Sequence, residues 1–342
     1  MSRSIYELPE PTPRSEGAGE VRLAGGPEAD RVPIGLIYNP RSHRNRGKDL
    51  DLGGREDVLV AAPQTRGQIV HALEDFAARG VELVIINGGD GTVRDVLTCG
   101  HDVFGDQWPA IAVLPKGKTN ALNVDLGAPS DWTAAQAADA FATGRRVVRR
   151  PLAVTPLDGE GRKVLGFILG AGAFTLGTDA GQDAHRMGLF DSLAVGMTTG
   201  WGVLQALFGR DDNPWRRGVG MRLRLMPDGR ELDHSGHGDP ARREIILAST
   251  LHRMPFGLKV FGRLKDGLKM AVLDRPRRRV VSALPLILAG WQPRWLRKAG
   301  LHQLRCEAFE FAIEDQFILD GEHFPAGRYC VEQGPELTFV TV

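Results

Sequence analysis

The stretch Leu83–Thr92, with the sequence LVIINGGDGT, decides the fold class of this chain. Its first four residues form a short apolar run, which is typical of a strand covered on both faces of a parallel sheet. Three glycines then allow the backbone to turn tightly and to bring its N–H groups against an anion. A helical pattern begins at Thr92, and helix N-termini stabilise negative charge. The stretch therefore predicts a strand, an anion-binding turn and a helix.

Asp90 lies inside this turn and would repel a bare phosphate. A divalent cation between the two groups removes the conflict, because Mg²⁺ binds carboxylate and phosphate oxygens together. The combination indicates a site for a nucleotide with Mg²⁺, formed by Gly88, Gly89, Asp90, Gly91 and Thr92. An ordinary strand-to-helix turn is the alternative interpretation of the same residues.

Strand and helix patterns alternate around this stretch. Apolar runs predict strands at Ile34–Tyr38, Val58–Ala61 and Ile111–Leu114, and apolar residues at helical spacing predict helices over 68–78 and 133–143. Alternation of this kind is typical of a parallel sheet in a doubly wound α/β domain.

Ligands of open α/β sheets bind outside the carboxyl ends of the strands. Two further polar segments follow predicted strands and should lie at that edge with the glycine turn. We therefore expect one nucleotide cleft that also contains Asn39, Gly117, Lys118, Thr119 and Asn120.

The pattern changes after residue 145. Strand-like stretches dominate, and many are bounded by Asp-Gly, a dipeptide favoured in hairpin turns. They cover residues 147–155, 164–169, 221–226, 244–248, 268–273, 308–313, 316–319 and 337–342. We predict an α/β nucleotide-binding domain over 31–145 and a mostly antiparallel β-rich domain over 146–335, with helices near 185–208 and 281–298. A strand at 336–342 is expected either to belong to the β-rich domain or to return to the α/β domain.

Composition sets outer limits on the function. A chain of 342 residues suggests two domains, and 42% hydrophobic with 25% charged residues excludes a wholly disordered or fibrous protein. The net charge of +1 excludes a globally basic nucleic-acid-binding surface, and we expect no nucleic-acid partner. Three scattered cysteines are not a disulfide framework and fit a cytoplasmic location. Residues 1–30 predict a disordered leader, and we expect no transmembrane segment.

Three motifs, Asn39-Pro40, Gly88–Thr92 and Pro115–Asn120, have a spacing that resembles the catalytic domain of the diacylglycerol kinase family, which includes sphingosine and ceramide kinases. The resemblance covers about residues 32–342 and extends more distantly to NAD kinases and phosphofructokinases. It implies a fold of the NAD kinase/diacylglycerol kinase type, with the active site between an α/β domain and a β-rich domain. It also implies ATP and Mg²⁺ as cofactors and a membrane lipid as the acceptor.

The resemblance assigns roles to single residues. Asp90 would lie near Mg²⁺-ATP, and Asp320 matches the proposed general base in the family's Asp-Gly-Glu segment, which ends here at Glu322. Asp95 stands where relatives commonly carry Glu, and Asp266 begins a segment that resembles a structural Mg²⁺ site of some bacterial members. We therefore expect catalytic roles for Asp320, Glu322 and Asp90, and metal-binding roles for Asp90, Asp95 and Asp266.

The residues around Asp320 give a weaker but separate argument. Asp320 and Glu322 are two apart in an extended chain and therefore point to the same face. One carboxylate could take the proton of an alcohol while the other orients it or touches a metal. A solvated Asp-Gly hairpin turn is the alternative interpretation.

Residues 275–306 contain eight Lys or Arg and no acidic residue. Between the basic groups lies the apolar stretch 280–291, which ends in Trp291 and is followed by Trp295. Apolar residues, tryptophans and flanking cations together suit a membrane interface. We expect residues 275–298 to bind an anionic membrane surface, the inner face of the cytoplasmic membrane. A core helix with a solvated basic edge is the alternative.

These observations predict an ATP-dependent kinase that phosphorylates a hydroxyl of a membrane lipid, either diacylglycerol or a ceramide or sphingoid base. A soluble kinase of NAD or a sugar phosphate is one alternative. A non-catalytic, nucleotide-sensing membrane module is another, because Lys118 and Ala121 depart from the family pattern Gly-Thr-x-Asn-Asp. The sequence leaves a homodimer open.

Overall fold

The structure is a computed structural model that describes residues 22–23, 33–46, 50–159, 161–175, 217–275 and 277–342. The predicted helix at 185–208 and most of the predicted leader at 1–30 lie outside these residues. Arg22–Leu23 form a short strand, β1, that pairs antiparallel with β3 (Val58–Ala61). The prediction of a disordered leader is therefore wrong at these two residues.

The first part of the molecule is built on a seven-stranded sheet with the order β1-β3-β2-β4-β5-β20-β6. Its central strands β3, β2, β4, β5 and β20 are parallel, and both edge strands run antiparallel to their neighbours. The bounds of the strands not yet given are β2 (Ile34–Tyr38), β4 (Leu83–Gly88), β5 (Ala110–Pro115), β6 (Arg145–Arg149) and β20 (Leu337–Thr341). The last strand thus returns to the first sheet.

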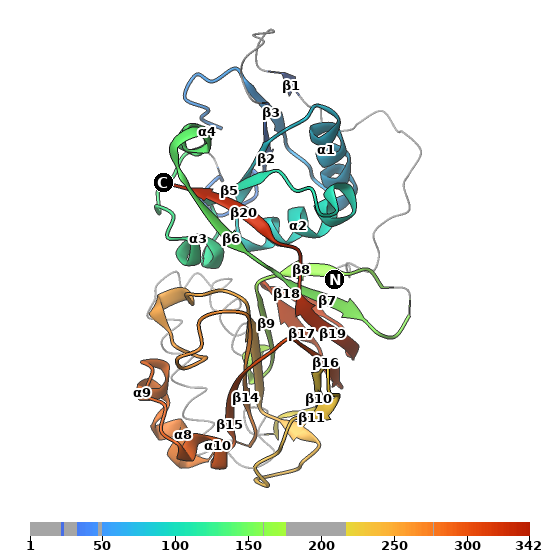
Figure 1. Ribbon diagram of the computed structural model, residues 1–342, viewed down its shortest axis with the longest axis vertical. Coiled ribbons are helices and arrows are strands. Elements are labelled where there is room, and N and C mark those ends of the chain that lie inside the picture. The colour runs from blue at the N-terminus through green and yellow to red at the C-terminus, as the bar shows by residue number, and fades with distance from the viewer. Residues whose placement is uncertain (1–21, 24–32, 47–49, 160, 176–216, 276) are drawn as a thin grey trace.

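Helices cover both faces of this sheet (Figure 1). Buried side chains of α1 (Arg66–Ala78) and α2 (Asp90–Phe104) pack on one face, and those of α4 (Ala134–Thr143) pack on the other. Side-chain caps fix two of the helix starts, because Thr65 accepts a hydrogen bond from Gln68 and Thr133 forms a capping box with Gln136. A short helix, α3 (Ala121–Leu126), follows β5.

The second part consists of two antiparallel sheets around one core. Their strand orders are β11-β10-β16-β19-β7-β8, with β12 paired to β10, and β15-β14-β13-β9-β17-β18. The bounds are β7 (Leu152–Pro156), β8 (Val164–Gly166), β9 (Ile168–Gly172), β10 (Val219–Met226), β11 (Arg230–Glu231), β12 (Arg242–Arg243), β13 (Ile245–Ser249), β14 (Leu268–Leu273), β15 (Leu301–Cys306), β16 (Ala308–Ile313), β17 (Phe317–Leu319), β18 (Glu322–Phe324) and β19 (Gly327–Gln333). The predicted fold class, an α/β sheet followed by antiparallel β structure, is confirmed.

Two predicted strands are each divided in the structure. The strand expected at 147–155 is broken at Pro151, which has no N–H to donate, so that β6 joins the first sheet and β7 the second part. The strand expected at 164–169 is broken at Phe167, and β8 and β9 belong to different sheets. The first sheet therefore extends past the expected boundary at residue 145.

The predicted helix at 281–298 is replaced by three short helices, α8 (Arg278–Ser282), α9 (Leu284–Leu288) and α10 (Trp295–Lys298). Pro285 and the left-handed Gly290 (φ 104°) divide the apolar stretch. Among the described residues, no helix combines the length and the apolar character that a bilayer span requires.

Gly35 of β2 allows helix α1 to approach the sheet closely. A Cβ at this position would lie 2.5 Å from the Phe76 ring, which is fully buried. We expect Gly35→Ala to lower the free energy of unfolding by about 1–3 kcal/mol, the usual cost of overpacking a core. Gly67→Ala is the matched control, because the nearest atom to its added Cβ lies 4.0 Å away. Equal urea midpoints for the two variants would contradict the close approach.

Candidate active site

Three polar loops meet at the carboxyl ends of β2, β4 and β5. The Asn39 Nδ2 donates a hydrogen bond to Thr92 Oγ1 at 2.8 Å, which joins the first loop to α2. The backbone N–H of Lys116 donates to the carbonyl of Gly88 at 3.2 Å, which joins the second loop to the third. The three loops that the strand order was expected to bring to one edge of the sheet therefore lie together.

Gly89 and Gly117 pack backbone against backbone. A Cβ added to either glycine would lie 2.7 Å from the Cα atom of the other, so a side chain at either position would force the loops apart. Gly89 is also the N-cap of α2 and offers no side chain to its N–H groups. The first turn of α2 therefore presents backbone donors and a helix dipole to the cleft, the arrangement that binds phosphate in many nucleotide sites.

Asn120 holds the third loop in shape. Its side chain forms two hydrogen bonds with Gly117: the amide oxygen accepts one from the N–H at 2.7 Å, and the amide nitrogen donates one to the carbonyl at 3.1 Å. Its own backbone is left-handed, with φ 52°, a conformation that asparagine tolerates better than most residues. Lys118 and Thr119 are exposed at the tip of this loop. Asn120 thus positions the loop, while Lys118 and Thr119 lie where a ligand can reach them.

Asp90 connects the glycine turn to the start of α3. Its Oδ1 accepts a hydrogen bond from the N–H of Ala121 at 2.8 Å. Burial raises the pKa of the Asp90 carboxyl, and this effect outweighs the lowering by the N–H groups of Asn120 to Leu122. The carboxylate is thus held at the first turn of α2, where an incoming cation would compensate for its lost hydration.

Asp320 lies in the turn between β17 and β18 with a left-handed backbone, φ 46°. Its two carboxyl oxygens accept hydrogen bonds from the N–H groups of Phe167 at 2.8 Å and Ile168 at 2.9 Å. Burial raises the pKa of Asp320 to about 7, and the nearby Asp90 carboxylate acts in the same direction. Asp320 is therefore not a freely solvated turn residue, and its charge interacts with that of Asp90 in the first part of the molecule.

A cluster of ion pairs binds this turn to the helices of the first part. Glu322 Oε2 lies 2.6 Å from the guanidinium of Arg94 and 2.8 Å from that of Arg66. Arg94 also donates to the carbonyl of Leu319 at 3.2 Å, and Asp95 completes the cluster at 3.0 Å from Arg94 and 3.1 Å from Arg66. The turn that carries Asp320 is thereby fixed against α1 and α2.

Sequence reasoning missed both arginines. Arg94 lies four residues after Asp90 and therefore on the same face of α2, a spacing that was available as a signal. Arg66 begins α1, far from any motif, and nothing in the sequence marks it. The carboxylates of Glu322 and Asp95, expected in catalytic and metal-binding roles, are engaged by these arginines.

Asp266 lies away from this cluster, just before β14. Its side chain is 73% exposed, and its Oδ1 lies 3.6 Å from His252 Nδ1. In the described part of the chain, no three His, Cys, Asp or Glu residues are grouped so that they could hold a metal ion. The structure therefore does not bring Asp90, Asp95 and Asp266 together as one metal site.

Comparison with known proteins shows which family the first part of this chain resembles. Residues 33–149, which contain the three loops, match the family model of the diacylglycerol kinase catalytic domain. The resemblance to this family is confirmed. The chain is 31% identical over 133 residues to a diacylglycerol kinase of Bacillus subtilis (strain 168), a match that covers 36% of this chain and 42% of that relative.

A second relative is the probable lipid kinase YegS of Escherichia coli O127:H6 (strain E2348/69 / EPEC). It is 38% identical over 72 residues, which is 21% of this chain and 24% of that protein. The matches thus span less than half the length of these curated relatives. The crystal structure of a putative diacylglycerol kinase from Bacillus anthracis str. Sterne has the same fold, with a TM-score of 0.60 at 14% identity over 92% of this chain and 99% of that one.

The Glu322 ion pairs should contribute strongly to stability. The side chains of Glu322 and Arg94 are only 15% and 6% exposed, so Glu322→Gln would leave a buried guanidinium short of its partner. We expect a loss of about 3 kcal/mol in the free energy of unfolding, the lower end for a broken buried pair.

Glu336→Gln is the matched control, because its pair with Arg150 is exposed and should be worth less than about 1 kcal/mol. Urea unfolding followed by fluorescence measures both variants. A smaller loss for Glu322→Gln than for Glu336→Gln would show that the cluster does not join the two parts.

Proposed function

We propose that this protein is an ATP-dependent lipid kinase, which transfers the γ-phosphoryl group to a hydroxyl of a membrane lipid. The observation that carries the proposal is the buried Asp320 carboxyl, which is held by two backbone N–H groups and whose charge interacts with that of Asp90 in the glycine turn. The family of residues 33–149 and the names of the curated relatives support a lipid kinase.

The triphosphate of ATP would bind in the cradle between the first turn of α2 and the third loop. The close approach of Gly89 and Gly117, which a Cβ would block, brings the third loop against the first turn of α2, whose N–H groups would bind the phosphate. Asn39 would hold the loop through its bond to Thr92. The residues proposed to form this nucleotide site are Asn39, Gly88, Gly89, Gly91, Thr92, Gly117, Lys118, Thr119 and Asn120.

Asp90 would hold Mg²⁺ together with the phosphates. A single protein carboxylate suits this ion, which keeps several water ligands and often binds through one or two carboxylates and the substrate phosphates. When bound, Mg²⁺ would neutralise charge on the phosphates. Asp95 and Glu322 would instead keep Arg66 and Arg94 in place, and Asp266 has no role in this step.

Asp320 would accept the proton of the attacking hydroxyl. Phosphoryl transfer to an alcohol requires mainly alignment of the groups and a proton acceptor. The two N–H groups of Phe167 and Ile168 fix the orientation of the carboxylate. A pKa near 7 makes it a stronger base than an ordinary aspartate while leaving much of it ionised at neutral pH.

The acceptor is proposed to be diacylglycerol, ceramide or a sphingoid base, presented by a membrane. Residues 275–298 would contribute to docking on an anionic inner leaflet. Val280, Ile287 and Leu296 of this segment form a small core, while Leu286 and Trp291 are 58% and 47% exposed. The core-helix interpretation thus applies to the buried residues of the segment, while the exposed Leu286 and Trp291 are available to contact lipid.

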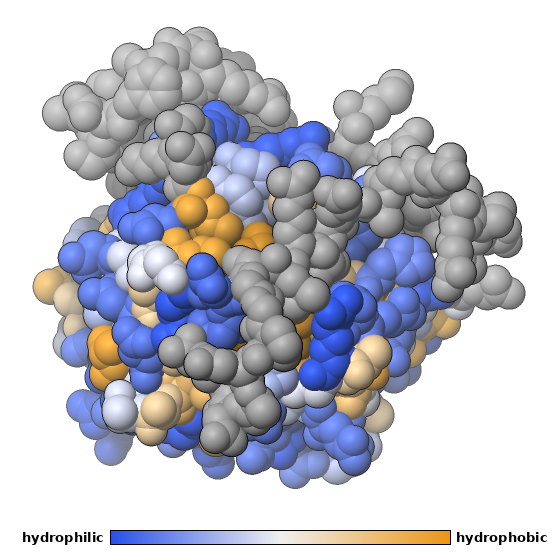
Figure 2. Space-filling model, turned by 90° about the horizontal axis from the view of Figure 1, so that it is seen from above, coloured by the Kyte–Doolittle hydropathy of each residue, from blue (hydrophilic) through white to orange (hydrophobic). Residues whose placement is uncertain are grey.

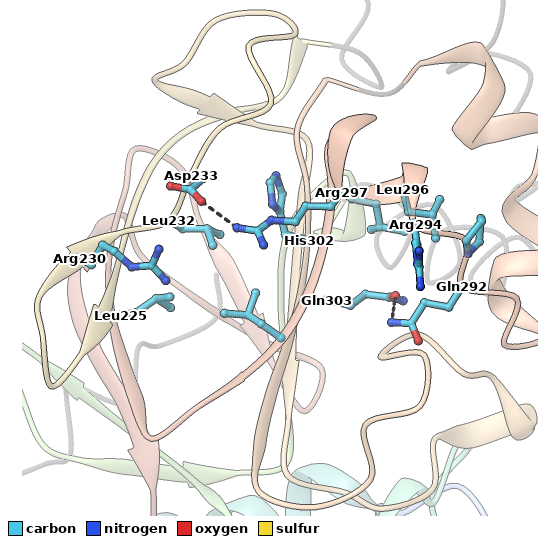
Figure 3. A pocket seen from close by; sticks show the side chains of 13 residues that line it. Leu225, Arg230, Leu232, Asp233, Gln292, Arg294, Leu296, Arg297, His302 and Gln303 are labelled. Atoms are coloured by element: carbon cyan, nitrogen blue, oxygen red, sulfur yellow. Dashed lines mark hydrogen bonds and ion pairs between the residues drawn. The ribbon is translucent and has the colours of Figure 1, made fainter.

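Arg294 and Arg297 of this segment border a cavity of about 320 Å³ in the second part. Figure 3 shows the guanidinium groups of Arg230 and Arg297 pointing toward each other across it, with Arg297 paired to Asp233 at 2.9 Å. Figure 2 looks onto the α/β part at the opposite end, where the surface drawn in colour is mostly hydrophilic with hydrophobic residues in several places.

Asp320→Asn tests the proposed base. We expect turnover to fall by about 10²–10⁴, the usual contribution of a general base, with ATP affinity nearly unchanged. Labelled phosphate transfer from ATP to a panel of diacylglycerol, ceramide, sphingosine and NAD measures it and also separates a lipid kinase from a soluble one. Asp228→Asn, at another Asp-Gly turn, is the matched control. Unchanged turnover in the Asp320 variant would remove it from the mechanism.

The pH dependence gives a separate test. Asp320 must be deprotonated to act as a base, and burial and the Asp90 charge raise its pKa to about 7. The value of kcat/KM should therefore fall about tenfold for each pH unit below about 7, because the Asp320 carboxyl becomes protonated. The residual activity of Asp320→Asn should lack this limb. A wild-type profile that stays flat between pH 5 and 7 would contradict the assignment.

A further inference from the structure

One exposed aromatic residue has no place in the site described so far. Phe256, in the short 3-10 turn Pro255–Gly257 after β13, is 88% exposed. Its backbone is also left-handed, with φ 58°, a conformation that costs free energy for a bulky residue. Exposure of a phenyl ring and backbone strain at one residue are typical of a residue with a binding role.

The loop that carries Phe256 walls a cavity of about 680 Å³. Its other walls are Val124 of α3, Lys269 of β14 and Gly290 after α9. In the described part of the chain, no Asp or Glu is among the residues that line the cavity. Its basic side chains are Arg253, Lys259, Arg263, Lys265 and Lys269, together with His252. The cavity is therefore suited to an anion.

Lys269 places a buried ammonium group in this wall. It is 1% exposed, and its Nζ donates to the carbonyls of Lys265 at 2.8 Å and Gly267 at 3.1 Å. Burial lowers the pKa of Lys269 to about 8, although Asp125 and Asp266 act in the opposite direction. An anion in the cavity would stabilise the charged form.

The cavity lies beside the proposed active site. Ala121, whose N–H binds Asp90, begins α3, and Val124 of the same helix lines the cavity three residues later. This separation is about 5 Å along the helix axis. The N–H of Arg253 donates to Asp125 Oδ1 at 2.6 Å, which fixes the loop to α3. A lipid bound at the cavity would therefore contact the helix whose first N–H binds Asp90.

The same surface continues to α9. The N–H of Lys259 donates to the carbonyl of Leu288 at 2.8 Å, so the loop packs on the end of that helix. Figure 1 shows α3 and α9 on the same side of the molecule. Of the eight large hydrophobic side chains that are exposed among the described residues, five lie on this surface: Val124, Phe256, Leu258, Leu286 and Trp291.

We propose that this surface docks on an anionic membrane leaflet, with Phe256 and Leu258 inserted among the lipids and the basic cavity around one lipid phosphate. The occupant is a bilayer lipid, because a free phosphate would leave the exposed apolar side chains in water. The inference rests on the proposed function and specifies how the membrane meets that site. It extends the docking surface beyond residues 275–298 to the mouth of the cleft.

Vesicle co-sedimentation of the full chain, without ATP or acceptor, tests the proposal. The vesicles are phosphatidylcholine alone or phosphatidylcholine with about a third phosphatidylglycerol. We expect binding only to the anionic vesicles. Partition should weaken about tenfold for Phe256→Ser, which loses the burial of a phenyl ring, and about thirtyfold or more for R263E/K265E, because each basic residue contributes about 1 kcal/mol near an anionic leaflet. Thermal unfolding should match the wild type, because these side chains are exposed.

Matched controls are Val148→Ser, an exposed apolar residue of β6, and Arg222→Glu, an exposed arginine of β10, and both should bind as the wild type does. Normal binding by Phe256→Ser and R263E/K265E, with loss in R277E/R278E alone, would restrict docking to residues 275–298 and overturn the inference. Equal binding to both vesicle types would also overturn it. So would a protein that binds no vesicles but whose wild type, unlike R263E/K265E, is stabilised by inorganic phosphate. A chain that transfers no phosphate but shows the expected binding would refute only the kinase.

Discussion

The buried guanidinium of Arg94 is the constraint on which the candidate site depends. Arg94 belongs to α2, the helix that begins at Asp90. Its side chain is only 6% exposed, and it contacts both Glu322 and the carbonyl of Leu319. A charge this deep is stable only when paired, so the turn that carries Asp320 cannot move away from α2 without a large energetic cost. Because the glycine turn and Arg94 belong to one helix, the two halves of the site share one rigid support.

The break between β8 and β9 completes this arrangement. Phe167 lies between two strands of different sheets, and its N–H and that of Ile168 both turn toward the Asp320 carboxyl. An unbroken strand would direct successive N–H groups to opposite sides and could not hold both oxygens. The two donors stabilise the carboxylate, while burial and Asp90 oppose its ionisation, and the balance leaves its pKa near neutrality.

Helix α3 links this chemistry to the outer surface. Its first N–H binds Asp90, and its last turn holds the loop of Phe256 through Asp125, which is itself paired with Arg149. A membrane bound at the loop would therefore be connected to the nucleotide loops through a single short helix. The second part of the molecule thus has two functions in the proposal, since it supplies the base and presents the lipid.

The sequence by itself determined the elements and the loops. Apolar and strand-like stretches predicted β2, β3, β14 and β16 with their observed bounds, and the glycines and Asp90 located the turn, because strand and turn preferences depend on near neighbours in the chain. Only the tertiary structure decided that Pro151 and Phe167 separate strands between sheets, and that Glu322 and Asp95 bind Arg66 and Arg94. Glu322 lies more than two hundred positions after both arginines, and whether such distant residues meet is set by how the sheets pack, about which local patterns carry no information.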